Sequence, residues 1–268
     1  MEQWNRWMAK HPRIAGMLIG VAMVVIGKWW LWMGVPKWLT YPFLGVALIV
    51  FALWAGAAGA RLLKKPIEYL KEQCDPYPYL EEINVQREYP GNGTAKQLRD
   101  IDYVMTLRCI GEYALSYELL MQINIDKYGG MIPAYKVIYY NNLMDLCTLM
   151  GKYPEAVVWY EKLLQLFHDL KPGKQKERLR KTVDSNLAGY HFCKGEYDRA
   201  LYALSLAKPE NMSERIENAM MYGRTYLAMG ETERAKKPLQ FVAENGNKLY
   251  CATEARELLA KINMEENE

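Results

Sequence analysis

The sequence predicts an all-α membrane protein, in which a two-helix transmembrane hairpin precedes a set of stacked helical hairpins. Two long apolar runs, residues 14–35 and 39–60, predict the membrane part, and Lys28 is the one charged residue within them. As a helix, each run is long enough to cross the ~30 Å hydrocarbon layer of a bilayer. From residue 95 onward, apolar residues recur at helical spacing and a glycine turn returns several times, with no alternation typical of strands.

Cations at the two entrances of the hairpin predict its orientation. Six basic residues flank the entrances: Arg6, Lys10, Arg13, Arg61, Lys64 and Lys65. The connecting turn, residues 36–38, contains Lys37 alone, and Trp29, Trp30, Trp32 and Trp38 gather near it. By the positive-inside rule, residues 1–13 are a cytoplasmic N-terminus and residues 36–38 an external turn of a two-pass cell-membrane protein. The C-terminal part is then cytoplasmic as well.

Three features of the hairpin have two interpretations each. Lys28 can extend its long side chain to the outer headgroups, or mark an ion path, although neither run supplies an acidic partner. Small residues at four-residue spacing, such as Gly16 and Gly20, pack the hairpin together or form an oligomerisation face. The first run is a membrane span or a cleaved signal peptide, but it is too long for the latter and lacks a cleavage site.

The composition after the hairpin limits the class of protein. Residues 1–65 carry a net charge of +7, so the rest carries −4 of the total of +3, which does not favour nucleic-acid binding. The five cysteines have wide, irregular spacing, which predicts neither a disulfide framework nor a zinc site. Residues 61–94 are rich in proline and glycine, and we expect a juxtamembrane linker there, with a short helix over 67–73.

A glycine turn recurs four times in the C-terminal part. The four segments are GEYALSYELL (111–120), GKYPEAVVWYEKLL (151–164), GEYDRALYALSLA (195–207) and GETERAKKPLQFV (230–242). In the last three, an alanine and then a large apolar residue follow at constant spacing: Ala156 and Tyr160, Ala200 and Leu204, Ala235 and Leu239. We expect the glycine to end one helix at positive φ, the alanine to permit close helix crossing, and the large residue to fill the space beside the next hairpin.

This order of residues resembles the tetratricopeptide repeat family, whose unit has roughly 34 residues. The resemblance covers residues 95–263 and implies a right-handed solenoid of helical hairpins. The unit around Gly111 departs from the pattern, because Ser116 stands where alanine is expected. Longer spacings predict loop insertions at 125–133 and 170–178. A last helix at about 249–262 caps the stack, and residues 264–268 form an acidic tail.

The sequence lacks the motifs typical of an enzyme. Its three histidines are isolated, and the glycine-rich phosphate loop, the dinucleotide fingerprint, the zinc-protease motif and the nucleophile elbow are all missing. We therefore expect no catalytic residue, no metal and no cofactor. The densest charged run, residues 171–181, is interpreted as a solvated loop leading into a helix. The alternative is a patch that faces anionic lipid or an acidic partner.

The resemblance implies a recognition groove on the concave side of the solenoid, lined by the first helix of each unit. The corresponding positions here are Ile138, Asn141, Asp145, Thr148, Thr182, Ser185, Gly189, Phe192, Glu217, Met220, Arg224 and Leu227. Their mixture of polar and apolar side chains suits an extended peptide or a helix, and the alternative is ordinary exposed helix surface. We expect a membrane-tethered adaptor or scaffold for an unidentified protein or peptide, of open oligomeric state. The alternative is a structural subunit that docks into a larger membrane complex through the hairpin.

Overall fold

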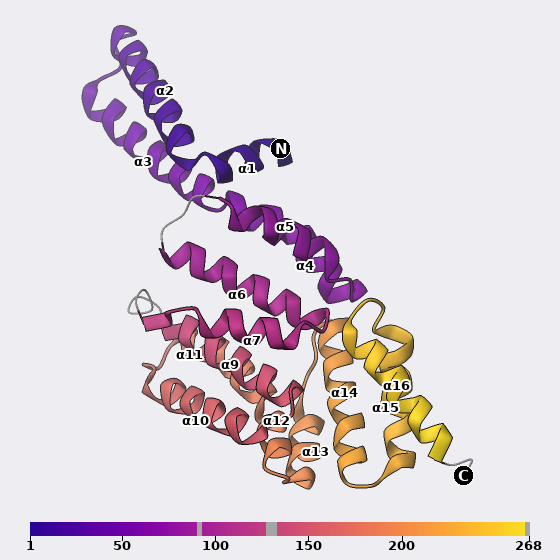
Figure 1. Cartoon of the computed structure of the whole chain (residues 1–268). Helices are drawn as coiled ribbons and strands as arrows, with labels where there is room; N and C mark the ends of the chain where they lie inside the picture. The colour runs from indigo at the N-terminus through magenta and orange to yellow at the C-terminus, as the bar shows by residue number, and fades with distance from the viewer. Residues whose placement is uncertain (90–92, 127–132, 266–268) are drawn as a thin grey trace.

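The computed structural model of the 268-residue chain describes residues 1–89, 93–126 and 133–265. Within these ranges every regular element is a helix and no strand occurs, so the all-α prediction is confirmed. Figure 1 shows the hairpin of α2 and α3 projecting from the rest of the molecule. Helix α1 lies across the base of this hairpin, and the remaining helices follow it in a layered array.

The projecting hairpin consists of α2 (Pro12–Trp32) and α3 (Lys37–Gly56). Both are long and apolar enough to cross a membrane, and their most apolar windows are 11% and 6% buried. The contact between them is close near the turn, where the rings of Trp30 and Phe43 lie 4.7 Å apart. An added Cβ at Gly16 or Gly20 would meet nothing within 4 Å, so these two glycines do not pack against α3.

The segment expected to be a linker is helical. It forms most of α4 (Ala58–Gln73) and the whole of α5 (Tyr77–Arg87), which pack on each other and on α1 (Glu2–Lys10). Pro76 and Pro78 lie at the start of α5, where a missing backbone N–H costs nothing. Pro66 is tolerated inside α4 because Leu62 and Leu63 are buried and anchor that helix. The short helix expected over 67–73 lies within α4, but most of the remaining segment, expected to be irregular, is helical as well.

The C-terminal part is an array of antiparallel helices. Its elements are α6 (Gly93–Cys109), α7 (Tyr113–Met121), α9 (Pro133–Leu149), α10 (Tyr153–Asp169), α11 (Lys174–Ser185), α12 (Leu187–Cys193), α13 (Tyr197–Leu206), α14 (Met212–Ala228), α15 (Thr232–Asn245) and α16 (Tyr250–Glu265). The bounds of α16 are close to those predicted for the capping helix, 249–262. Helix α11 occupies much of the predicted loop 170–178. Its Lys176 side chain donates to the carbonyls of His168 and Leu170 and so holds the start of α11 against the end of α10. The other predicted loop, 125–133, lies largely outside the described residues.

All four turn glycines adopt positive φ, between 72° and 90°, as the sequence predicts. In each turn the residue after the glycine donates to a carbonyl five residues earlier, at 2.8 to 3.0 Å, as in Lys152 to Cys147 and Glu196 to His191. Each glycine also donates to the carbonyl three residues before it, at 2.9 to 3.2 Å. This pair of bonds is the Schellman motif, which satisfies the last carbonyls of a helix.

The alanines and large residues of the repeated pattern are buried, as predicted. Ala156, Ala200 and Ala235 are fully buried, and Tyr160, Leu204 and Leu239 are at most 5% exposed. In the departing unit, Ser116 is also fully buried, and its hydroxyl donates to the carbonyl of Glu112 at 2.6 Å. A small hydroxyl therefore replaces the alanine without an unsatisfied polar group.

The end of α4 contacts the last helices. The C-terminal end of α4 contacts the loop before α16, where Lys248 pairs with Asp75 at 2.7 Å and Asn247 donates to the carbonyl of Gln73 at 2.7 Å. Cys74 is fully buried in the core that Ile216 and Leu239 form with their neighbours. The helix that continues from the apolar hairpin is therefore part of the same packed body as the last helices.

Candidate functional site

The candidate site is the surface where α9, α12 and α14 turn toward α6 and α16, which we call the inner face. It contains Asn141, Asp145 and Thr148 of α9, Phe192 of α12, and Glu217, Arg224 and Leu227 of α14. Because these helices are the first members of successive hairpins, residues far apart in the sequence meet on one surface. Arg108 of α6 and Glu254 of α16 complete it.

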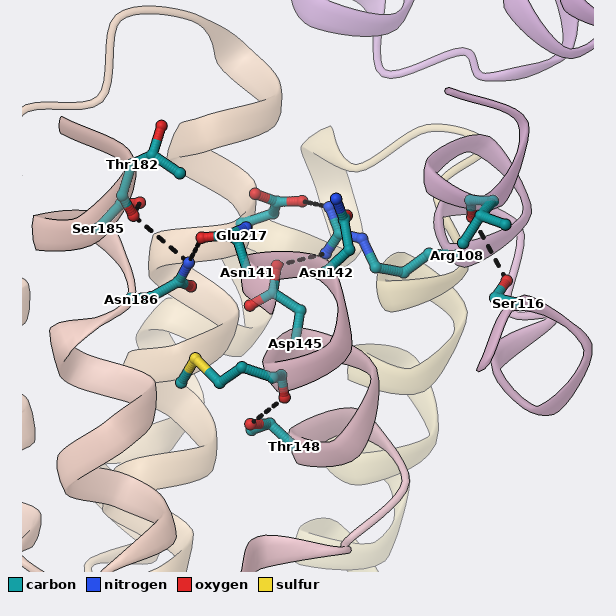
Figure 2. Close-up of polar contacts among 12 residues, drawn as sticks. Arg108, Ser116, Asn141, Asn142, Asp145, Thr148, Thr182, Ser185, Asn186 and Glu217 are labelled. Carbon is teal, nitrogen blue, oxygen red and sulfur yellow. Dashed lines mark hydrogen bonds and ion pairs between the residues drawn. The ribbon is translucent and has the colours of Figure 1, made fainter. Parts of the chain in front are cut away.

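Arg108 joins three helices on the inner face. Figure 2 shows its side chain between Glu217, at 2.9 Å, and Asp145, at 4.0 Å. Burial raises the pKa of Asp145 to about 6, Arg108 opposes that rise, and Glu217 adds to it. For Arg108, burial alone would lower the pKa, but the two carboxylates raise it. The guanidinium therefore stays charged and holds two acidic groups that would otherwise repel each other.

A second set of polar contacts crosses from α9 to the α11–α12 region. The amide of Asn186 donates to the side-chain oxygen of Asn141, and it also faces the carbonyl of Thr182 (Figure 2). The hydroxyl of Thr148 donates to the carbonyl of Met144 at 3.0 Å and lies 3.2 Å from the sulfur of Cys193. Asn186 occupies the break between α11 and α12, so these bonds hold the broken helix against α9.

A pocket of about 340 Å³ opens at one end of the inner face. Four of the predicted groove residues line it: Thr148, Phe192, Arg224 and Leu227. Tyr153, Leu258 and Glu254 complete its walls, and the ring of Tyr153 stands edge-on to Phe192 at 5.6 Å. The guanidinium of Arg224 is held by both carboxylate oxygens of Glu254, at 2.5 and 2.6 Å, so the pocket combines apolar walls with an already neutralised ion pair.

Other predicted groove residues lie elsewhere. Met220 is 4% exposed and belongs to the core beneath α14, because the end of α4 covers that side of the helix. Ile138 packs against the core between α6, α7 and α9. Thr182 and Ser185 lie on α11 and bond to each other, with the Ser185 hydroxyl donating to the Thr182 carbonyl at 2.9 Å. Gly189 is buried, and an added Cβ would lie 2.9 Å from Met144.

Three residues of the inner face were not predicted. Arg108 lies three residues before Gly111, the position that gives Thr148, Phe192 and Leu227 in the other units, so the same spacing rule applied to the departing unit identifies it. Tyr153 stands two residues after Gly151, as Tyr113 and Tyr197 do after Gly111 and Gly195, and this spacing alone does not connect it to the groove. Glu254 lies in the capping helix, and no local pattern connects it to Arg224.

The remaining candidate chemical groups have structural roles. Burial raises the pKa of the thiols of Cys74, Cys109 and Cys147 to about 11, which disfavours the nucleophilic thiolate. No cluster of three metal-binding side chains occurs within the described residues. In the basic run, Lys176 caps α10, and Lys181 pairs with Glu210 and Glu214 at 2.9 and 3.2 Å. These contacts favour the structural interpretation of that run.

Fold and site together define a class: an all-α protein with an exposed apolar helical hairpin, followed by an array of helical hairpins whose inner face carries a pocket of mixed polar and apolar lining. No protein-family model matches the chain, and searches of curated proteins and of solved structures find no match either. The function is therefore inferred from the chain's own residues.

Proposed function

We propose that this chain is a membrane-tethered scaffold, in which α2 and α3 span a bilayer and the helical array binds a protein or peptide partner. The surface of the hairpin supports the tether. Met17, Val21, Val25, Ile49 and Leu53 are each more than 60% exposed. In water this surface would be strongly unfavourable, whereas lipid tails solvate it. A core helix of a soluble protein would instead be mostly buried.

The charges at the two ends of the hairpin support an orientation with both termini in the cytoplasm. Lys10, Lys64 and Lys65 are exposed at the end that joins the array, and Lys37 is exposed at the opposite turn. Arg6 and Arg61, by contrast, bond within the protein, to Glu82 at 2.8 Å and to the carbonyl of Trp54 at 2.5 Å. By the positive-inside rule we therefore still expect the array on the cytoplasmic side.

The array is a tetratricopeptide-like, right-handed solenoid under this proposal. Its support is the repeated order of a Schellman turn, a buried alanine and a buried large residue over three successive hairpins. Such arrays present one continuous face to partners. On this chain the charged residues of that face bond to one another, so we expect recognition through the apolar pocket rather than through charge.

The pocket is the observation that carries the binding function, because it brings together predicted groove residues from three helices. Phe192, Leu227, Leu258 and Tyr153 offer apolar and aromatic walls to a side chain of an extended peptide or a helix. Confinement to a membrane raises the effective concentration of the groove for partners in the same membrane.

Site-specific photocrosslinking tests this function in the intact, membrane-embedded chain. A photoreactive phenylalanine analogue replaces Leu227 in the pocket, and, as a matched control, Val158, which is 48% exposed on α10. We expect a protein adduct of defined mass at Leu227 and none at Val158. Equal crosslinking patterns at the two positions would contradict the assignment of the pocket as the binding site.

A second function is favoured by the open side of α2. Gly16 and Gly20 would accept an added Cβ without a contact, so this side of the helix is free to approach another transmembrane helix closely. In that case the chain is a structural subunit of a larger membrane complex. Gly20→Leu distinguishes the two: the particle mass in mild detergent stays constant for a scaffold and falls for a docked subunit.

A further inference from the structure

Helix α1 has two different sides. Asn5 and Met8 are 6% and 1% exposed and face the start of α4, where Met8 packs with Ala58. Met1 and Trp4, nearer the N-terminus, are 96% and 45% exposed. The rings of Trp4 and Trp7 stack at 5.1 Å, and His11 continues this row, 5.8 Å from Trp7. This row of Trp4, Trp7 and His11 is here called the aromatic side of α1: Trp4 is exposed, Trp7 and His11 are half-buried, and Trp7 also packs against the cluster of Met8, Ala15 and Ala58.

Bonds to the rest of the protein fix α1 in this position. Arg6 pairs with Glu82 of α5 at 2.8 Å, and the Glu82 side chain is 9% exposed. Glu82 also accepts from Gln86 at 2.9 Å, and Arg61 donates to the side chain of Asn5 at 3.3 Å. Because these groups hold the helix on α4 and α5, its aromatic side cannot rotate inward to hide from solvent.

Tryptophan is distributed at two levels along the apolar hairpin. Seven of the eight tryptophans lie at its ends: Trp29, Trp30, Trp32 and Trp38 near the turn, and Trp4, Trp7 and Trp54 at the base. Trp38 and Trp54 are separated by 16 positions of one helix, or about 24 Å at the α-helical rise. That separation is comparable with the hydrocarbon thickness of a bilayer, and tryptophan prefers the interface on each side of it.

We infer that the aromatic side of α1 is a lipid contact surface, which binds the phospholipid headgroup layer at the base of the hairpin. Figure 1 shows α1 running across the base of the hairpin rather than along it, as a helix in the plane of the interface would. The exposed Lys10, Lys64 and Lys65 lie at the same end and fit the phosphate oxygens of that layer.

The consequence is a fixed geometry of the whole protein. Helix α1 is bound to lipid on one side and to α4 and α5 on the other, so it holds the array at one tilt relative to the bilayer. This inference rests on the proposed membrane tether, in which the same hairpin spans the bilayer.

Tryptophan fluorescence of the full chain in phosphatidylcholine vesicles tests the inference. The difference in emission between the native chain and the double variant Trp4→Phe/Trp7→Phe isolates the two α1 tryptophans. We expect lipids brominated close to the glycerol backbone to quench this difference, and acrylamide in the water to quench it at least about threefold less than in the denatured chain. Far-UV circular dichroism of the double variant checks that it is folded.

Two separate measurements distinguish failure of the α1 contact from failure of the membrane tether. Difference emission that acrylamide quenches as strongly as in the denatured chain, with no effect of brominated lipid, would overturn the role of α1. Retention of the chain in the vesicle pellet after an alkaline carbonate wash reports on α2 and α3 independently. Loss of the chain from that pellet would overturn the proposed tether and this inference together.

Discussion

Arg108 is the residue through which the first, second and last hairpins meet. Its guanidinium binds carboxylates of α9 and α14 while its own helix, α6, packs on α5. Its side chain is 18% exposed, so the ion pairs act in a partly desolvated setting where an unpaired charge is costly. The contact is structural, and it removes Asp145 and Glu217 from the set of groups that can select a charged ligand.

Replacement of Arg108 by methionine should destabilise the chain by about 2–4 kcal/mol, because Asp145 and Glu217 then face each other without a cation. Adding Glu217→Gln to this variant should recover part of the loss, since the like-charge repulsion is removed. Arg180→Met is the matched control: Arg180 is 54% exposed and pairs with Glu177, so we expect a change within about 0.5 kcal/mol. Chemical unfolding of the detergent-solubilised chain measures all three. Equal losses for Arg108→Met and Arg180→Met would contradict the role of the network.

Asp102 of α6 predicts how stability depends on pH. Burial raises its pKa to about 6, although a hydrogen bond with Tyr79 opposes the rise. The folded state therefore binds a proton more tightly than the unfolded state, and stability should rise as the pH falls from about 7 to about 4. Asp102→Asn keeps an acceptor for Tyr79 and removes the buried charge, so we expect a gain of about 1–3 kcal/mol at pH 7.5.

Thermal unfolding at pH 7.5 and pH 5 measures this effect. The variant should gain less from acidification than the native chain, and Asp145, whose pKa burial also raises to about 6, should supply the remaining gain. Asp100→Asn is a control of opposite sign, because Asp100 accepts from Arg87 at 3.0 Å and its replacement breaks that ion pair. A lower melting temperature for Asp102→Asn at pH 7.5 would refute the prediction.

At the level of single residues, the sequence could predict which helices supply the candidate site but not which side chains are free. The spacing before each turn glycine brings Thr148, Phe192 and Leu227 to one pocket, because identical turns orient successive helices alike. It could not reveal that Arg224 is bound by Glu254, or that α4 covers Met220. Those contacts come from segments that have no fixed spacing relative to the repeats.

The turns are the elements that the sequence predicts most directly, because a Schellman turn is formed by a few consecutive residues and requires positive φ at one of them. Gly111 has a second constraint. At this position, φ is 90° and an added Cβ would lie 2.5 Å from the ring of Tyr250, whereas Gly195 has φ of 72° and open space around it. Gly111 is thus where the first hairpin meets the last helix.

We expect Gly195→Ala to cost about 1 kcal/mol, the strain of a side chain at positive φ. Gly111→Ala should cost about 2–4 kcal/mol, because the ring of Tyr250 must also move. In a chain that already carries Tyr250→Ala, the ring is gone. Adding Gly111→Ala to that chain should therefore cost about as much stability as Gly195→Ala costs in the native chain. Denaturant unfolding measures the order, and a smaller loss at Gly111 than at Gly195 would show that α16 does not pack there.

Helices α4 and α5 show where reasoning from local pattern fails. Pro66, Pro76 and Pro78 predict an irregular segment, because proline removes a backbone donor. Their positions within the helices, together with the burial of Leu63, Tyr79 and Ile83, reverse that expectation. The stabilising contacts are long-range, from Arg6 to Glu82 and from Asp75 to Lys248, and are not visible in any local window of the sequence.

Packing contacts connect the apolar hairpin to the last helix through α4. Helix α4 continues from α3 after a turn at Ala57, and its far end contacts the loop before α16. A flexible linker would let the inner face sample many orientations. Helices α4 and α5 instead pack on each other and on α1 at the base of the hairpin, which suits the proposed scaffold.

Sidedness is the property of the whole molecule on which its proposed function depends. The native thiols are poor reporters of it, because Cys74 is fully buried and burial raises the pKa of Cys251 to about 12. Introduced cysteines at exposed positions are suitable: Lys37→Cys at the hairpin turn and Glu161→Cys on α10. In intact cells, an impermeant maleimide should label Lys37→Cys and should label Glu161→Cys after permeabilisation alone, with the native chain as the background. Labelling of Glu161→Cys in intact cells would place the inner face outside the cell, where the cations at the base of the hairpin would oppose the positive-inside rule and the partner would have to be extracellular.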